Sequence, residues 1–251
     1  MVHLSEEFVA SIARALNKAR VPCVLWGHYL LNVHGVPSII ASIDFVVPDE
    51  DLTHGANALT DVTCLAECPN PAGCITSSEA RPTPPPAFHK HVQDSDITVG
   101  LFPQSETLWF LPPIDSALLS PAGDKLPCQF TLASHQSTLP PWRPGRGAGV
   151  FKPGHHPIVV PRSHILLEAF LRLYARNVGK RIGSFGMAMI GYMEGYVDDD
   201  GLLDAGLLPE PLRGFYKELH DENMTKPVRQ WTRELREALG VVSEEGEDDY
   251  T

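Results

Sequence analysis

The chain has 251 residues, of which 43% are apolar and 20% are charged; this size and composition are typical of one globular domain, or of a domain with an appendage. No apolar run reaches the roughly 18 residues that a membrane-spanning helix needs, and the first residues lack the basic-then-apolar pattern of a secretory signal. We therefore expect a cytoplasmic protein with no membrane partner. The net charge of −11 argues at first sight against polyanionic partners.

The charge is unevenly distributed along the chain. Residues 1–142 carry −8, residues 143–181 carry +7 and residues 191–251 carry −10. The cationic segment predicts a small anionic or nucleotide ligand, and solvated helix faces are the alternative interpretation. Its candidate ligand-binding side chains are Arg143, Arg146, Arg172 and Arg176. The acidic last quarter disfavours broad, non-specific DNA binding, whereas tRNA is retained as an alternative partner.

Proline usage and apolar periodicity predict an α+β half followed by a helical half. Seventeen of the 23 prolines fall between Pro69 and Pro161, and none lies between 162 and 208; proline interrupts both helices and strand ladders. Strands are expected at 21–26, 42–47, 89–92, 96–102, 108–111, 128–134 and 158–160. Helices are expected at 5–16, 28–34, 48–60, 162–177, 183–197, 208–220 and 227–239. These elements predict a domain over 1–161, a helical region over 162–240 and an acidic tail over 241–251.

One stretch carries a more specific pattern than composition does. An apolar strand ends at Gly27-His28, a short helix follows, Gly35-Val-Pro interrupts it, and a second strand contains Ser42-Ile-Asp44-Phe-Val-Val47. A glycine-led turn lets the backbone approach a phosphate closely. Residues at alternate strand positions point to the same face, so acids at such positions can share a divalent ion.

This arrangement resembles the nucleotidyltransferase superfamily over about residues 8–60, and more narrowly it looks like fungal proteins related to that fold. The family's signature is an apolar residue followed by Gly-Gly or Gly-Ser, then two acids alternating with apolar residues. The resemblance implies a mixed β-sheet with flanking helices. It also implies transfer of a nucleotidyl group from a nucleoside triphosphate, with Mg²⁺ held by acids. Gly27, His28 and Ser42 fall at its ligand-binding positions.

The sequence departs from this signature at two positions. His28 stands where the family has Gly or Ser, and Ser42 stands where it has the first acid, so that only Asp44 remains of the pair. A further acid on a neighbouring strand usually activates the acceptor hydroxyl; Asp96 is the first candidate and Asp94 is the alternative. Asp44 and Asp96 are thus the expected catalytic and metal-binding residues. A single carboxylate is a poor clamp for Mg²⁺, which needs several well-placed oxygens.

Three functional hypotheses follow. The first is a nucleotidyltransferase-like protein that binds a phosphate-bearing or anionic ligand and transfers a nucleotidyl group through a degenerate metal site. The second is an inactive member of the same fold that is retained for ligand binding or protein interaction. The third is a tRNA-dependent synthase of the cyclodipeptide-synthase type, because the cationic segment suits an RNA backbone and ester aminolysis needs no metal.

The five cysteines include no C-x-x-C pair. Cys68 and Cys74 are separated by five residues, and Cys64, His89 and His91 lie nearby in the sequence, so a zinc site drawn from these residues is the alternative interpretation. Structural zinc sites usually space paired ligands by two to four residues. The sequence therefore favours a loop and a neighbouring strand over a zinc site here.

Overall fold

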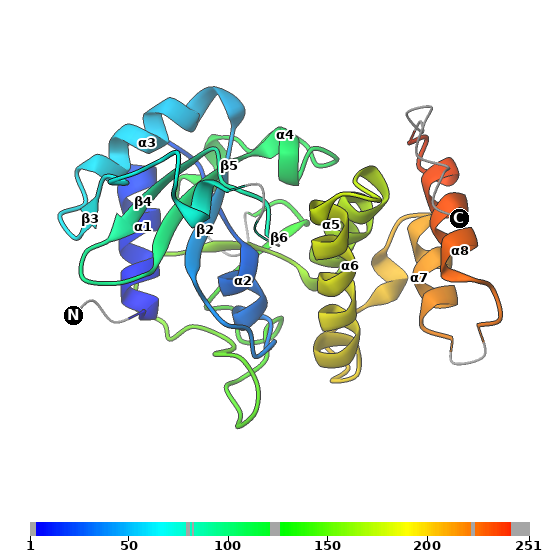
Figure 1. Ribbon diagram of the computed structural model, residues 1–251. Coiled ribbons are helices and arrows are strands. Elements are labelled where there is room, and N and C mark those ends of the chain that lie inside the picture. Colours follow the sequence, from blue (N-terminus) through cyan, green and yellow to red (C-terminus); the bar gives the residue numbers. More distant parts are fainter. Residues whose placement is uncertain (1–3, 79–80, 82, 121–125, 222–223, 242–251) are drawn as a thin grey trace. The chain divides into compact units, whose positions relative to one another are not determined.

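The computed structural model describes residues 4–78, 81, 83–120, 126–221 and 224–241 (Figure 1). The chain divides into two compact units, one made of residues 1–79 and 85–162 and the other of residues 80–84 and 163–251. The boundary expected after residue 161 lies one residue from this division. The acidic tail expected over 241–251 lies outside the described residues, apart from Val241.

Of the elements that the described residues form, the first unit contains the strands and four of the helices. Its helices are α1 (Glu6–Lys18), α2 (Gly27–Val33), α3 (Leu52–Thr60) and α4 (Gln104–Thr107), with 3₁₀ turns η1 (Asp49–Asp51), η2 (Ile75–Ser77) and η3 (Ser116–Leu118). Its strands are β1 (Val24–Trp26), β2 (Ser42–Val47), β3 (Leu65–Ala66), β4 (Phe88–Val92), β5 (Thr98–Pro103), β6 (Phe130–Leu132) and β7 (Val159–Pro161).

The main sheet is mixed, with strand order β1-β2-β5-β4-β3. β2 and β5 are parallel, whereas β1 pairs with β2, β4 with β5 and β3 with β4 in antiparallel fashion. β6 and β7 form a separate antiparallel pair. The expected α+β class is therefore confirmed, and the sheet is mixed as expected.

Two helices cover one face of the main sheet (Figure 1). α1 begins at Ser5, whose hydroxyl accepts a hydrogen bond from the Phe8 amide at 3.2 Å, as a helix N-cap does. Its apolar residues recur at helical spacing and are buried. In α3, a Cβ atom placed on Gly55 would lie 3.0 Å from Leu101 of β5 and 3.5 Å from Leu16 of α1. The Leu101 face of the sheet thus packs against α1 and α3, and the opposite face remains for other groups.

The second unit is helical. It comprises α5 (Ser163–Arg176), α6 (Arg181–Tyr192), a π-helical turn η5 (Met193–Asp198), the 3₁₀ turn η6 (Ala205–Leu207), α7 (Leu212–Leu219) and α8 (Val228–Ala238). Trp231 of α8 is fully buried, and its indole N–H donates to the Phe215 carbonyl at 3.1 Å. Within the described part of the chain, none of the helices combines the length and the apolar character that crossing a bilayer requires.

The strand expected at 108–111 is wrong. Leu108 ends α4, and the Leu111 amide donates to the Leu108 carbonyl, so this apolar run turns rather than extends. The buried Gln104 side chain holds the turn, because its amide nitrogen donates to the Pro112 carbonyl at 2.9 Å and its oxygen accepts from the Ile114 amide at 2.8 Å. The sequence analysis also missed β3 and α4.

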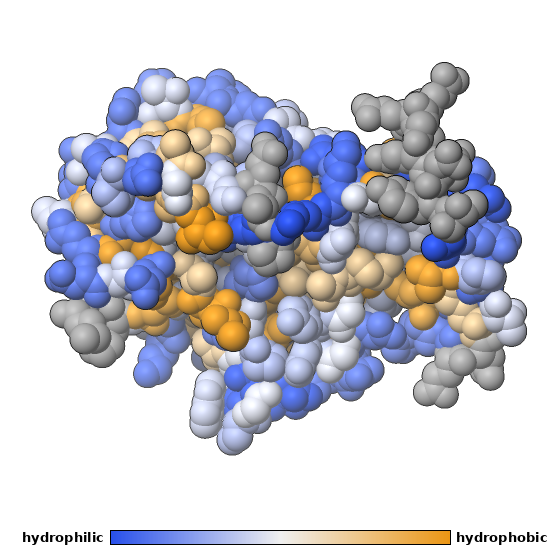
Figure 2. All heavy atoms as spheres, viewed as in Figure 1, coloured by the Kyte–Doolittle hydropathy of each residue, from blue (hydrophilic) through white to orange (hydrophobic). Residues whose placement is uncertain are grey.

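Exposed apolar side chains of the first unit are scattered. Ile39, Ile75 and Trp142 are 91%, 72% and 68% exposed; Ile39 and Trp142 lie on separate loops, and Ile75 begins η2. On the face drawn in Figure 2, apolar residues of this unit lie among hydrophilic ones. Among the described residues of this unit, the distribution does not identify one large apolar docking surface.

Candidate functional site

Polar side chains line the sheet face opposite α1 and α3. Ser42 and Asp44 lie on β2, Thr98 on β5, and His89 and His91 on β4. Residues two apart on a strand share a face, and so do directly paired residues of neighbouring strands. The register places Asp44, Gly100 and His89 in one row across the sheet. All five polar residues are buried except His91, which is half-buried.

Asp44 occupies a closely fitted space in this row. Its carboxylate accepts a hydrogen bond of 2.6 Å from the Ser42 hydroxyl. A Cβ atom on Gly27 would lie 2.8 Å from one Asp44 carboxylate oxygen, and a Cβ atom on Gly100 would lie 2.5 Å from the other. Gly27 also has a φ of +68°, which side chains rarely adopt. The two glycines therefore make room for the carboxylate itself, a role that the sequence analysis assigned to an approaching phosphate.

The structure does not bring Asp96 to Asp44. Asp96 is exposed in the turn between β4 and β5, two residues before β5 begins. Asp44 pairs with Gly100, four residues further along the strand direction, which separates the two backbone positions by about 13 Å. The expectation that Asp44 and Asp96 together bind a metal ion is therefore wrong. The cause is register, because the acid precedes β5 instead of lying within it.

The histidines at the two ends of α2, His28 and His34, have protein partners. His28 is the second residue of α2, and its Nδ1 lies 2.6 Å from the Ser38 hydroxyl. His34 is 2% exposed, and its Nε2 donates to the Pro161 carbonyl at 3.0 Å. Burial lowers the pKa of His34 to about 4, so its ring is neutral and serves packing.

The cationic candidates lie in both units. Arg143 and Arg146 are on the loop before β7, and this loop is anchored to the end of α2: the Gly147 amide donates to the Gly35 carbonyl at 2.7 Å. Arg172 and Arg176 are on α5 of the second unit. Arg172 forms an ion pair of 2.8 Å with Glu168, a buried carboxyl whose pKa is raised by burial despite this partner. Arg172 thus has a structural partner within its own helix.

A second cluster on the polar face contains Cys68, Cys74, His89 and His91. Each residue offers one ligand atom, and all four atoms lie within 4.8 Å of one another. His89 and His91 come from β4, and the cysteines come from the loop between β3 and η2. The spacing of these residues in the sequence favoured a loop and a neighbouring strand over a zinc site, and the structure brings them together. The signal that identifies the cluster is the alternation of His89 and His91 on one strand together with two nearby thiols.

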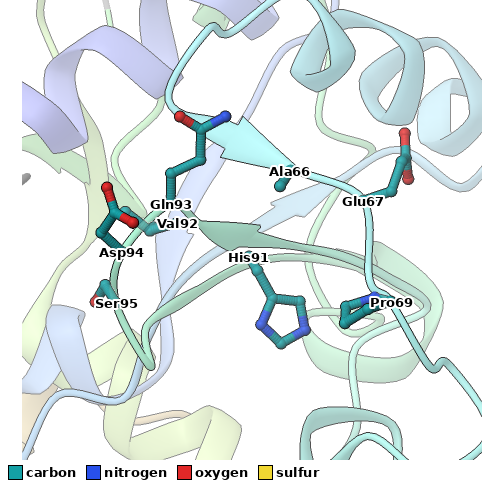
Figure 3. Close-up of a pocket in the computed structure, with 8 residues that line it drawn as sticks. All are labelled: Ala66, Glu67, Pro69, His91, Val92, Gln93, Asp94 and Ser95. Carbon is teal, nitrogen blue, oxygen red and sulfur yellow. The ribbon is translucent and has the colours of Figure 1, made fainter.

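A shallow, open pocket of about 460 Å³ adjoins this cluster (Figure 3). Its lining residues are Ala66, Glu67, Pro69, His91, Val92, Gln93, Asp94 and Ser95. Figure 3 shows His91 extending from its strand toward the side where Pro69 lies. The pocket therefore gives solvent an approach to the edge of the cluster.

Comparison with protein-family models, with curated proteins and with solved structures yields no match to this chain.

Proposed function

We propose that this chain is a nucleotidyltransferase-like protein that binds a phosphate-bearing or anionic ligand without metal-dependent transfer. The proposal joins the family resemblance of the Gly27–Val47 stretch to the degenerate carboxylate set. It favours the second of the three hypotheses, an inactive member of the fold retained for binding.

The single observation that carries the proposal is the state of Asp44. Within the described strands β1, β2 and β5, Asp44 is the only carboxylate. Ser42 occupies the alternate position and donates to Asp44, and Thr98 and Gly100 lie opposite them on β5. Mg²⁺ requires near-octahedral coordination by several well-placed oxygens, and carboxylates usually supply one or two of them. The Ser42 hydroxyl, which donates to Asp44, is a poor substitute for a second carboxylate.

The ligand would lie along α2, between its two ends. His28 stands at one end, and the loop carrying Arg143 and Arg146 is tied to the other end through Asn32 and Gly35. Seven helical residues span about 10 Å. A span of this length suits a nucleotide better than a lone phosphate. The arginines would supply guanidinium groups for the phosphates of that nucleotide.

Calorimetric titration with ATP and with CTP, each with and without Mg²⁺, tests this proposal. We expect binding that Mg²⁺ does not strengthen, and no release of pyrophosphate. Because each charge-assisted contact contributes about 1.5–3 kcal/mol, Arg146→Ala should weaken binding by about tenfold or more. The control Lys18→Ala removes an exposed cation at the end of α1 and should leave the affinity unchanged.

Two results would contradict the proposal. Mg²⁺-dependent binding that is lost in Asp44→Ala and accompanied by pyrophosphate release would restore the transferase hypothesis. Absence of binding to either nucleotide at millimolar concentration would remove the ligand-binding hypothesis. Retention of the protein on tRNA at low salt, with no nucleotide binding, would favour the synthase hypothesis instead.

A further inference from the structure

We propose that Cys68, Cys74, His89 and His91 form a four-ligand zinc site that fastens the loop after β3 to strand β4. The zinc site uses different residues from the proposed nucleotide-binding site, and the two proposals are independent of each other. Nothing in the Gly27–Asp44 pattern predicts it.

The backbone register explains why these four residues meet. β3 pairs with β4 so that Leu65 lies opposite Val92 and Ala66 opposite His91. Continuing this antiparallel register places Glu67 opposite Lys90, and these two side chains do form an ion pair. The next position places Cys68 opposite His89, on the same face of the sheet. The loop then turns back at Asn70–Gly73, where the Gly73 amide donates to Asn70 at 3.1 Å, and returns Cys74 to the same place.

The spacing of the ligand atoms fits a tetrahedral zinc ion. Zinc–sulfur bonds of about 2.3 Å and zinc–nitrogen bonds of about 2.0 Å at tetrahedral angles place ligand atoms about 3.3–3.8 Å apart. The Cys74 sulfur lies 3.5 Å from His91 Nε2, and the remaining atom pairs are within 4.8 Å. The rings of His89 and His91 are inclined at 65° with centroids 5.4 Å apart, so they approach from different directions rather than stacking.

Both sulfur atoms have backbone hydrogen bonds that suit thiolates. Cys68 has a backbone hydrogen bond with Asn70, and Cys74 has one with Thr76, each two residues further along the chain. Such bonds favour the charged form of a sulfur that accepts them.

The donor set determines the metal and its role. Two thiolates and two imidazoles in tetrahedral geometry suit zinc, and their charges balance Zn²⁺. Four protein ligands leave no open coordination position, so the ion is structural. It would hold a loop whose neighbouring side chains are largely exposed, among them Pro69 and Ile75. Cys68 and Cys74 form no disulfide in this structure, so their thiols are available as ligands.

Metal analysis of the reduced wild-type protein tests the proposal directly. We expect about one zinc ion per chain, the stoichiometry of a single closed site. Removal of zinc by a chelator should speed amide hydrogen exchange in residues 66–78 and leave β2 unchanged, and returned Zn²⁺ should restore the protection. Co²⁺ in place of zinc should give the visible spectrum of a tetrahedral, thiolate-bound ion.

Matched cysteine variants locate the site. Cys74→Ser and His91→Ala should reduce zinc content to below about one-tenth of an ion per chain, because three ligands seldom retain a structural ion. Cys64→Ser and Cys128→Ser remove thiols outside the four-ligand set and should retain the full content. If a variant does not fold, the wild-type chelation and Co²⁺ measurements still decide.

Several outcomes would overturn the zinc site. These are a wild-type protein that binds no Zn²⁺ when reduced, a Co²⁺ spectrum without thiolate character, or zinc content that Cys64→Ser lowers as much as Cys74→Ser. The proposal would also be overturned if the protein isolated under non-reducing conditions contained a Cys68–Cys74 disulfide and bound no metal after reduction. Copper or iron in place of zinc would contradict the choice of metal.

Discussion

The Asp44 region and the Cys/His cluster share one face of one sheet but differ in what their side chains can do. Asp44 and His89 belong to the same row, two strands apart across Gly100, which corresponds to about 10 Å. Asp44 accepts a hydrogen bond from its own strand and is enclosed by glycines. In the cluster, four metal-binding atoms converge at the edge of an open pocket.

The difference shows that a recognisable motif and a competent site are separate properties. The Asp44 region has the order of strand, glycine turn and strand from which the sequence resemblance was inferred, but the expected second carboxylate, Asp96, precedes β5 and does not reach Asp44. The cluster has an unusual ligand spacing in sequence, but antiparallel pairing of β3 with β4 brings its members together. Metal binding depends on where ligand atoms meet, so the second region is the better metal site.

The largest expected effect concerns His34, which tests whether the end of α2 belongs to the packed core. Its pKa is lowered from 6.5 to about 4 by burial. The unfolded chain therefore takes up a proton first, and stability is complete above about pH 6.5 and is lost as the pH falls toward 4. This group alone should lower the free energy of unfolding by about 3 kcal/mol across that range.

Urea unfolding at pH 7 and at pH 4.5 measures this loss. His34→Gln should remove part of the pH dependence, because the replacement does not titrate. His155→Gln, at an exposed position, should keep all of it. Equal pH dependence in both variants would show that the end of α2 is open to solvent rather than packed.

The next effect tests whether the glycines accommodate Asp44. Gly100→Ala would place a Cβ atom 2.5 Å from the Asp44 carboxylate and should cost about 2 kcal/mol, as overpacking does. In an Asp44→Ala background the cost should fall, because the clashing oxygen is gone and only the Pro86 ring remains close, at 3.1 Å.

Gly55→Ala is the matched control for this cycle. Its new Cβ atom would meet Leu101 at 3.0 Å, away from Asp44, so its cost should be the same in both backgrounds. If Gly100→Ala costs the same whether or not Asp44 is present, then the glycine serves another purpose, such as access for a ligand.

The smallest effect concerns the Ser42 hydroxyl. Ser42→Ala removes a hydroxyl that donates to the buried Asp44 carboxylate and should lower the free energy of unfolding by about 1.5 kcal/mol. Ser11→Ala, which removes a hydroxyl that donates to a carbonyl of its own helix, should cost about 0.5 kcal/mol. A neutral Ser42→Ala substitution, measured by urea unfolding, would mean that Asp44 finds its stabilising partner elsewhere.

Much of the fold was predictable because local patterns determine it. The alternating and apolar residues of 42–47 predicted β2 at its observed bounds, and the proline-free stretch after 162 predicted α5 and α6. The apolar residues at 108–111 gave the wrong element, since the side chain of Gln104 bonds several carbonyls and closes a turn there. A propensity argument does not include such a side-chain bond.

The candidate sites were less predictable because they depend on pairing between distant segments. Asp96 precedes a strand by two residues, and only the register shows that it misses Asp44. β3 has two residues, too few to predict, yet its pairing with β4 brings Cys68 beside His89. The spacing of Cys68 and Cys74 was unusual for zinc, and the turn at Asn70–Gly73 absorbs the extra residues.

Calorimetric titration of the reduced, metal-free protein with Zn²⁺ and, separately, with Mg²⁺ tests the contrast between the two regions most directly. We expect that about one Zn²⁺ ion binds per chain, that this binding is lost in Cys74→Ser, and that Mg²⁺ gives no binding heat. Binding of Mg²⁺ that disappears in Asp44→Ala, with no binding of Zn²⁺, would contradict it.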